Sequence, residues 1–320
     1  MTSGLRVTVA VPVCNEEEVL PALLQRVGAV LDATPGGPHE IVLVDDGSAD
    51  HTPELLEAAA KRDPRLVVVI LSRNFGHQAA LAAALRHATG DVTIVMDGDL
   101  QDPPEAIPAL LERYRSGFDV VYAQRVGRKE AWWLRLSYFV FYRLLTRVSD
   151  LRLPLDSGDF ALMSQRVVRE LCRMPEHHRY LRGLRTWAGF RQVGIPVERA
   201  RRSKGKSKYG VLQLFGLAFD GLFAFAITPL RAAAALGAVA IALSTLFAAY
   251  SLYAKLVLQR APQGFTALIL VITFLSGVNL FFLGLIGEYL GRVYEEVKAR
   301  PLYVVNRVIR GAAAADEIVG

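Results

Sequence analysis

Three aspartates follow a short apolar stretch in the first third of the chain. Residues 92–96, Val-Thr-Ile-Val-Met, are mostly β-branched and predict a buried strand. Asp97, Asp99 and Asp102 come directly after it, with Gly98 at the turn. Carboxylates at this spacing can share one hard divalent cation, Mg²⁺ or Mn²⁺, that keeps positions open for phosphate oxygens. The alternative is a solvated acidic loop, so the interpretation depends on the surrounding elements.

The segments around these aspartates alternate between strand and helix patterns. This alternation predicts an α/β layer with a mainly parallel sheet. The strands are expected at residues 5–11, 40–44, 66–71, 92–96 and 119–123, with helices ending near residues 33, 62 and 88.

Each of the first four predicted strands ends in a polar motif, at residues 12–16, 45–50, 72–77 and 97–102. Because open α/β sheets bind ligands beyond the carboxyl ends of their strands, we expect these loops to converge. Asp45 and Asp46 can accept hydrogen bonds from a base or ribose; the alternative is a turn with a helix cap. The sequence has no Gly-x-Gly-x-x-Gly turn and no Walker-type phosphate loop, which argues against a dinucleotide dehydrogenase or an NTPase.

The chain is apolar and basic. Its 320 residues predict one or two structural units; 52% are hydrophobic and the mean hydropathy is +0.28, with the excess in the last third. The net charge of +6 suits an anionic membrane surface or nucleic acid. Cys14 and Cys172 lie far apart, which indicates a reduced compartment. The first residues lack a signal-peptide pattern, so we expect the N-terminal part to stay in the cytosol.

Two stretches of the last third, 232–254 and 265–287, carry no charged residue. Each is long enough to span a hydrocarbon layer of about 30 Å; a buried hairpin is the alternative. Cations flank the pair on its outer sides, so the positive-inside rule places both ends in the cytosol. We expect a cytosolic domain at 1–210, an interfacial helix at 211–228, a transmembrane hairpin at 229–290 and a cytosolic tail at 291–320.

Basic residues precede this apolar third. Six cations lie within residues 199–209, where a lipid phosphate or anionic headgroups are more expected partners than nucleic acid. Arg125 and Arg128 can bind phosphate through their forked donors, or lie solvated on the surface. Residues 132–144 predict an apolar helix, either at the lipid interface or packed on the sheet.

The motifs at 12–16, 45–50 and 97–99 resemble those of family 2 glycosyltransferases with the GT-A fold. Those at 72–77 and 97–102 are similar to the polyprenyl-phosphate glycosyltransferases, which include bactoprenol glucosyltransferases and dolichol-phosphate mannose synthase. The resemblance covers nearly the whole chain. Cys14 departs from it, since an aromatic residue often stands there and stacks on the base.

The resemblance implies inverting transfer of one sugar from a nucleotide-diphosphate sugar, such as UDP-glucose, to undecaprenyl or another polyprenyl phosphate. It implies Asp159 and Asp99 as catalytic carboxylates and Asp97, Asp99 and Gln101 as metal ligands. Asp159 is expected in a turn before residues 161–163, and needs to act only weakly as a base because the second pKa of a phosphate monoester is about 6. The residues implied for the nucleotide sugar are Pro12, Asn15, Glu16, Asp45, Asp46, Asp97, Gly98, Arg125, Arg202 and Lys208, and those for the acceptor phosphate are Arg128, Arg199 and Ser207.

The resemblance further implies a multi-pass protein of the bacterial plasma membrane and a homo-oligomer. Processive polysaccharide synthases carry Gln-x-x-Arg-Trp near Leu184–Trp187, and the different spacing here favours a single transfer. Two alternatives stay open: a membrane glycolipid or polysaccharide synthase with another acceptor, and a catalytically silent membrane scaffold.

Overall fold

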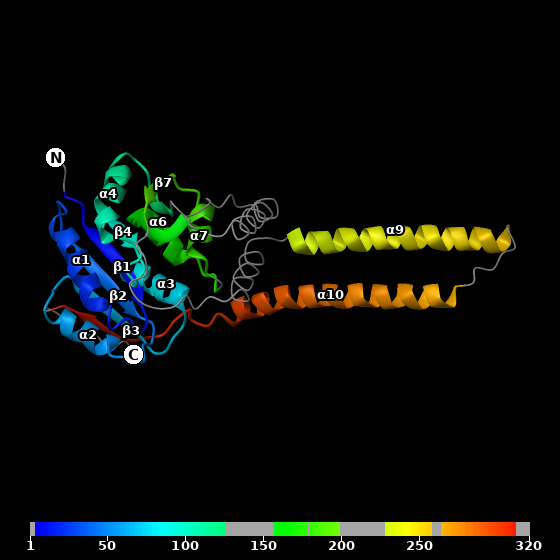
Figure 1. The fold of residues 1–320 in the computed structure, drawn as a ribbon, viewed down its shortest axis with the longest axis horizontal. Coiled ribbons are helices and arrows are strands. Elements are labelled where there is room, and N and C mark those ends of the chain that lie inside the picture. Colours follow the sequence, from blue (N-terminus) through cyan, green and yellow to red (C-terminus); the bar gives the residue numbers. More distant parts are fainter. Residues whose placement is uncertain (1–3, 126–156, 178, 199–227, 258–263, 312–320) are drawn as a thin grey trace. The chain divides into compact units, whose positions relative to one another are not determined.

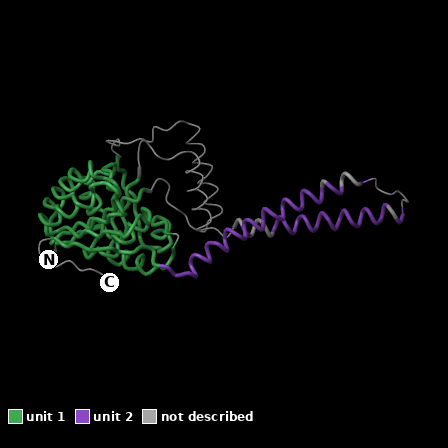
Figure 2. Tube along the Cα trace, turned by 90° about the horizontal axis from the view of Figure 1, so that it is seen from below, with its two compact units in different colours: residues 1–142, 151–214, 301–320 green, residues 143–150, 215–300 purple. Residues whose placement is uncertain are grey.

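The computed structural model describes residues 4–125, 157–177, 179–198, 228–257 and 264–311 (Figure 1). The chain divides into two compact units, which are described separately (Figure 2). The first, called the sheet unit, comprises residues 1–142, 151–214 and 301–320, and the second, called the helical unit, comprises residues 143–150 and 215–300.

The sheet unit contains one eight-stranded sheet in the order β7-β5-β6-β4-β1-β2-β3-β8. Residues of β1 to β4 are almost all buried, as expected for apolar strands that are covered on both faces. The strands are β1 (Val7–Val13), β2 (Glu40–Asp45), β3 (Leu66–Leu71), β4 (Val92–Val95), β5 (Val120–Arg125), β6 (Ser157–Ser164), β7 (Gln192–Val197) and β8 (Val305–Arg310).

The sheet is mixed but mostly parallel. β1 pairs in parallel with β2 and β4, β2 with β3, and β5 with β7. β6 runs antiparallel between β4 and β5, and β8 runs antiparallel to β3. The predicted α/β layer is therefore confirmed. Since β1 lies between β2 and β4, the strand order reverses at β1, which is where open α/β sheets bind ligands.

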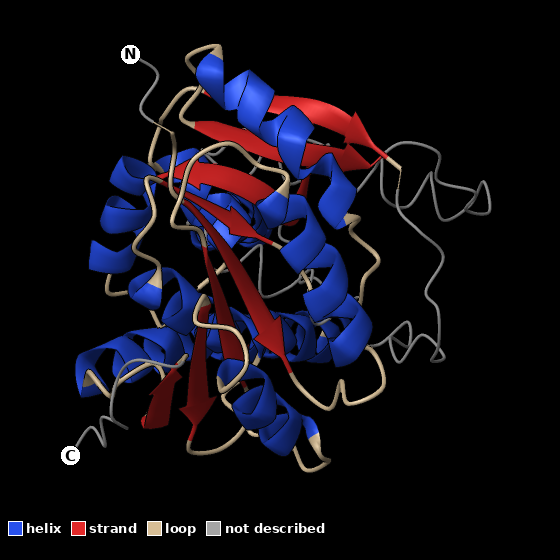
Figure 3. Cartoon of the chain, turned by 90° about the vertical axis from the view of Figure 1, so that its left-hand side faces the viewer, coloured by secondary structure: helices blue, strands red, loops and turns tan. Residues whose placement is uncertain are grey.

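Helices cover both faces of the sheet (Figure 3). Leucines and other apolar residues of α1 (Leu20–Asp32), α2 (Thr52–Ala60) and α4 (Ile107–Arg115) share one core with the strands, and η1 (Pro104–Ala106) leads into α4. On the other face, α6 (Gln165–Arg173) contacts both α3 (His77–His87) and α7 (Leu181–Trp187). All residues from Ala79 to Leu85 are buried, because the small alanines of α3 let its backbone approach the sheet closely.

Two predictions are corrected by the sheet. The predicted turn at Asp159 is wrong: Asp159 is the third residue of β6, whose backbone is paired with both β4 and β5. The sequence also places residues 305–310 in a tail, whereas they form β8 against β3. β8 is held there by the burial of Val308 and by an ion pair between Arg307 and Glu57 of α2.

The helical unit contains α9 (Thr228–Leu256) and α10 (Phe265–Lys298), which lie side by side (Figures 1 and 2). The two apolar stretches are thus helical, and α10 continues beyond residue 287. Ala235–Ala254 and Val271–Lys298 are long and apolar enough to cross a membrane by length and composition. Most of their large apolar side chains are exposed, including Phe247, Phe274 and Phe281.

Candidate active site at the carboxyl edge of the sheet

The loops after β1 and β2 are joined by hydrogen bonds. The Asn15 N–H donates to Ser48 Oγ (2.9 Å), and the Ala49 N–H donates to Asn15 Oδ1 (2.8 Å). Asn15 has a φ of +55°, a conformation that asparagine tolerates better than most residues. The Glu16 N–H donates to Thr52 Oγ1 (3.0 Å). Asn15 and Glu16, both predicted nucleotide-sugar residues, therefore have their backbone fixed against the neighbouring loop.

Asp45 and Asp46 are buried at the end of β2. The Ser48 hydroxyl donates to Asp45 Oδ1 (2.5 Å). The two oxygens of Asp46 accept the N–H groups of Phe75 (2.7 Å) and Gly76 (2.9 Å), so Asp46 fastens the loop after β3 to the end of β2. Burial raises the pKa of both carboxyls, against the lowering effect of these hydrogen bonds. Contact of either aspartate with a base or ribose stays a prediction.

Two glycines allow the loops to meet. Gly47 has a φ of +65°, and a Cβ there would lie 2.5 Å from the backbone of Arg73 and Asn74. A Cβ on Gly98 would lie 2.9 Å from Val13 Cγ1 and 3.2 Å from the Pro12 carbonyl oxygen. The predicted residues Pro12 and Gly98 are therefore in close backbone contact. The expectation that the four loops converge is confirmed.

His77 lies among three of the carboxylates. It is the first residue of α3, and its Nε2 lies 3.5 Å from Asp97 Oδ1. When it is protonated, it also lowers the pKa of Asp46 and of Asp159, against the raising effect of burial. From the sequence, His77 belongs to the 72–77 motif and no role is predicted for it. The signal that could have identified His77 is its position directly after Gly76, at the end of the loop that follows β3.

Asp97 and Asp99 lie on the loop that follows β4. The Gln101 N–H donates to Asp99 Oδ1 (3.0 Å), and Leu100 between them has a φ of +56°. Among the described residues, no group of three His, Cys, Asp or Glu side chains is arranged to hold a metal alone. Two neighbouring carboxylates nevertheless suit Mg²⁺, which is usually bound by one or two carboxylates together with substrate phosphates and water.

Asp159 lies at the same carboxyl edge of the sheet as Asp97, because β6 is antiparallel to β4 and β5 and begins where they end. In the register of β4 and β6, Val95 pairs with Ala161, so Asp159 falls opposite Asp97 when the register is extended by two residues. The carboxylate is buried and accepts two hydrogen bonds from Arg182 of α7, Nε–Oδ1 at 2.9 Å and Nη2–Oδ2 at 3.2 Å. Burial alone would raise the pKa of Asp159, but Arg182, His77 and Arg185 together hold it below its ordinary value. Asp159 is therefore an ionised carboxylate at neutral pH.

The structure brings together part of the predicted site. It places at one edge the predicted residues of the loops after β1, β2 and β4, together with Asp159. Arg125 is the last residue of β5, and its side chain lies outside the description. The segment 132–144 and residues 211–227 also lie outside the described residues. The same holds for five predicted phosphate-binding residues: Arg128, Arg199, Arg202, Ser207 and Lys208.

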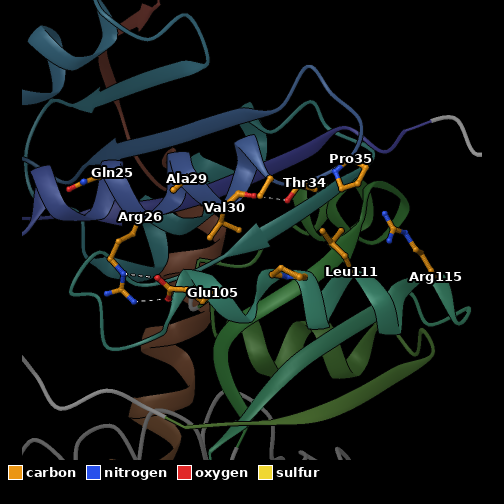
Figure 4. A pocket seen from close by; sticks show the side chains of 11 residues that line it. Gln25, Arg26, Ala29, Val30, Thr34, Pro35, Glu105, Leu111 and Arg115 are labelled. Atoms are coloured by element: carbon orange, nitrogen blue, oxygen red, sulfur yellow. Dashed lines mark hydrogen bonds and ion pairs between the residues drawn. The ribbon is translucent and has the colours of Figure 1, made fainter.

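A separate groove of about 610 Å³ lies between α1 and the η1–α4 segment (Figure 4). Apolar side chains such as Val30 and Leu111 line it, and the ion pair between Arg26 and Glu105 lies beside it. None of Asp45, Asp46, Asp97, Asp99 and Asp159 lines it.

Comparison with known proteins gives the family. Residues 8–172 match the model of Glycosyl transferase family 2. The chain is 39% identical over 308 residues to an uncharacterized glycosyltransferase of Bacillus subtilis, covering 96% of this chain and 95% of the relative. It is 37% identical over 315 residues to the SfII prophage-derived bactoprenol glucosyl transferase of Shigella flexneri (96% and 99%).

Two further proteins are similar. An undecaprenyl-phosphate 4-deoxy-4-formamido-L-arabinose transferase of Edwardsiella ictaluri is 36% identical over 318 residues (97% and 96%). A solved mannosyltransferase of Pyrobaculum calidifontis, in complex with GDP-Man and Mn²⁺, is 22% identical, with a TM-score of 0.46 and coverage of 79% and 82%.

Since the family model matches more than half of the chain and the curated relatives align over nearly all of it, the chain belongs to glycosyl transferase family 2, and its mixed, mostly parallel sheet is the GT-A-like sheet of a glycosyltransferase.

Proposed function

We propose that the protein transfers a single sugar from a nucleotide-diphosphate sugar to the phosphate of a membrane polyprenol. The observation that carries the proposal is the convergence of Asp46, Asp97 and Asp159 around His77, where the strand order reverses. Support for the acceptor comes from relatives that are named for bactoprenol and undecaprenyl phosphate and that align over almost the whole chain.

The donor would occupy the edge formed by the loops after β1, β2 and β4. We infer that Asp97 and Asp99, with Gln101 as a further ligand, would hold Mg²⁺ or Mn²⁺ beside the donor diphosphate. When bound, the metal neutralises the negative charge of the departing diphosphate. Buried Asp46 keeps the loop after β3 closed against this edge through its bonds to Phe75 and Gly76. A UDP-sugar, for example UDP-glucose, is our preferred donor.

The acceptor phosphate supplies the nucleophile. One of its oxygens forms a bond to the anomeric carbon while the bond from that carbon to the donor diphosphate breaks, and the nucleoside diphosphate leaves. Attack from the opposite face inverts the configuration. No proton has to be removed, because a phosphate monoester is largely a dianion at neutral pH. An ionised Asp159 suits this reaction as a group that orients the incoming acceptor and the sugar.

The helical unit suits a lipid acceptor. We infer that α9 and α10 cross the membrane as a hairpin, since both are longer than the roughly 20 residues that a span needs. β1 and β8 belong to the same sheet, so the chain leaves the sheet unit before the hairpin and returns to it afterwards. An even number of membrane crossings returns the chain to the side on which it left the sheet unit. This agrees with the expected cytosolic placement of both chain ends at a bacterial plasma membrane. A homo-oligomer stays a prediction.

The test is formation of lipid-linked sugar by the full chain in membranes. Undecaprenyl phosphate, Mg²⁺ or Mn²⁺ and a panel of labelled nucleotide sugars are supplied to the wild-type protein and to Asp97→Ala. Asp91→Asn is the matched control, because Asp91 precedes the other end of β4 and accepts a bond from the Arg6 N–H. We expect one donor to label the lipid with wild type and the control, and none with Asp97→Ala or a chelator.

Two outcomes contradict the proposal in different ways. If a donor binds but no label enters the polyprenol, the acceptor is wrong, and a synthase of another glycolipid or polysaccharide is favoured. If no nucleotide sugar binds, the protein is a scaffold that retains the fold.

A further inference from the structure

Two arginines of α7 act on the carboxylate of Asp159. Arg182 and Arg185 are three residues apart and so lie on the same side of this short helix. α7 packs on β6, the strand that carries Asp159. In the sequence both arginines suit an ordinary solvated helix face, yet the structure buries one of them completely and the other largely.

Arg182 holds both oxygens of Asp159. Its Nε and Nη2 donate to the two different carboxylate oxygens, so the contact is two-pronged. Such a pair fixes the rotation of the carboxylate as well as its position, which a single charged hydrogen bond cannot do. The contact is largely withdrawn from water, with 10% of the Asp159 side chain and 25% of the Arg182 side chain exposed.

Arg185 is the unusual member of the pair. It is 1% exposed, and its guanidinium carbon lies 5.1 Å from the centre of the Tyr122 ring. None of its three guanidinium nitrogens has a hydrogen-bond acceptor within the structure as described. Burying an unsatisfied charged group costs several kcal/mol, so a role beyond packing is expected of it. Asp159 is the first of the charges that act favourably on it.

Asp97 falls opposite Asp159 in the extended register of β4 and β6, and the positive groups that act on Asp159 among the described residues are Arg182 and Arg185 from α7 and, when protonated, His77 from α3. All three favour the ionised carboxylate. A carboxylate held in this way is a weak proton acceptor but a rigid, permanently charged one. This arrangement fits a group that orders reactants and does not fit one that exchanges protons in each cycle.

We propose that Arg182 is a positioning residue for the transfer reaction: its two-pronged contact fixes Asp159 toward the reacting centre, and Arg185 of the same helix adds a second positive charge. The inference rests on the proposed function, because it takes Asp159 to face the reacting sugar. Arg182 itself acts through Asp159, and its removal should leave donor binding intact.

The test is a double-mutant cycle on the full chain in detergent or membranes, with Asp159→Asn, Arg182→Met and the two combined. We expect kcat to fall by about 10²-fold in each single variant, the usual scale for a misplaced reacting group. If Arg182 acts only through Asp159, the double variant should match Asp159→Asn, whereas independent roles would give about 10⁴-fold. The KM for the donor should stay near the wild-type value in all three.

Two controls separate positioning from folding. Arg182→Lys keeps the charge but loses the fork, so its kcat should lie between wild type and Arg182→Met with an unchanged melting temperature. Arg166→Gln removes an arginine of α6 that pairs with Asp119 at 2.9 Å on the surface, and it should retain wild-type activity.

Failure of the proposed function and failure of the positioning role of Arg182 give different results. If the wild-type chain labels no polyprenol with any donor, the proposed function fails. The stability of the same four chains then still reports on the pair: additive changes in melting temperature would overturn the inferred coupling. If wild type is active, the inference is overturned by an active Arg182→Met or by multiplicative losses in the double variant.

Discussion

Replacing Arg185 with Met should stabilise the sheet unit while slowing the enzyme. Burial lowers the pKa of Arg185 to about 10, even with the opposing attraction of Asp159 included. At about 1.4 kcal/mol for each pH unit, the charged side chain is unfavourable in the folded chain by about 3 kcal/mol at neutral pH. At neutral pH Arg185 is charged in both the folded and the unfolded chain, so the full free-energy cost lowers the free energy of unfolding.

Met removes this cost and keeps an unbranched apolar chain against Tyr122. The variant loses the contact between the guanidinium and the ring, a contact type worth up to about 2 kcal/mol when it is desolvated. The net gain is about 1–2 kcal/mol, in line with other buried charges replaced by apolar residues. For a domain of this size that corresponds to a rise in melting temperature of roughly 2–8 °C.

The assay is thermal unfolding of the full-length protein in detergent, with the rate of lipid-linked sugar formation measured on the same preparations. We expect the melting temperature of Arg185→Met to rise and kcat to fall, by less than in Arg182→Met. A melting temperature lowered by more than 3 °C would refute the reasoning, because it would mean that Arg185 is stabilised by partners as a buried ion. Arg166→Gln, which removes a largely exposed charge from α6, should change neither quantity.

Three further outcomes are expected. Gly98→Ala should lower donor affinity and melting temperature, since its Cβ would press on Val13 and on the Pro12 carbonyl; binding of labelled donor measures this, and unchanged affinity would contradict the close packing of the loops. Deletion of residues 301–320 should destabilise the sheet unit, because it exposes the edge of β3. Limited proteolysis measures this against a full-length Asn306→Ser control, and equal protease resistance of the two would show that β8 contributes nothing to stability. The pKa of Asp159 lies below its ordinary value, so its ion pair stabilises the fold at pH values above the unfolded-state pKa, and this stabilisation is lost as pH falls through the folded-state pKa. In urea titrations at and below about pH 4, the wild type should therefore lose stability relative to Asp159→Asn. Parallel pH dependences of the two chains would refute the pairing.

Much of the sheet could be predicted because its central strands are short apolar runs between turn residues. The runs at 40–44, 66–71 and 92–96 differ by at most one residue at either end from β2, β3 and β4. The polar motifs after them had to meet once the strands were parallel. Local sequence therefore suffices where an element is buried on both faces.

The rest depends on pairings between distant residues. β8 mixes apolar Val308 and Ile309 with Arg307 and Arg310 without a strict alternation, a pattern that also suits a solvated tail, and only the open edge of β3 makes it a strand. Asp159 reads locally as a turn residue because Ser157 and Gly158 precede it. The burial of Arg185 and the contact of His77 with Asp97 likewise depend on helices packing on strands far away in the chain. No local periodicity encodes such contacts.

The position of β8 in the chain has a consequence for how the enzyme is made. Its residues follow both apolar helices, yet its partner β3 ends at residue 71. During synthesis the sheet therefore remains one strand short, with the edge of β3 open, until α9 and α10 have been translated. Completion of the sheet therefore comes after both apolar helices have been made. If α9 and α10 cross a membrane as proposed, β8 can reach β3 only when both crossings are complete, so pairing of this strand would report correct insertion of the hairpin.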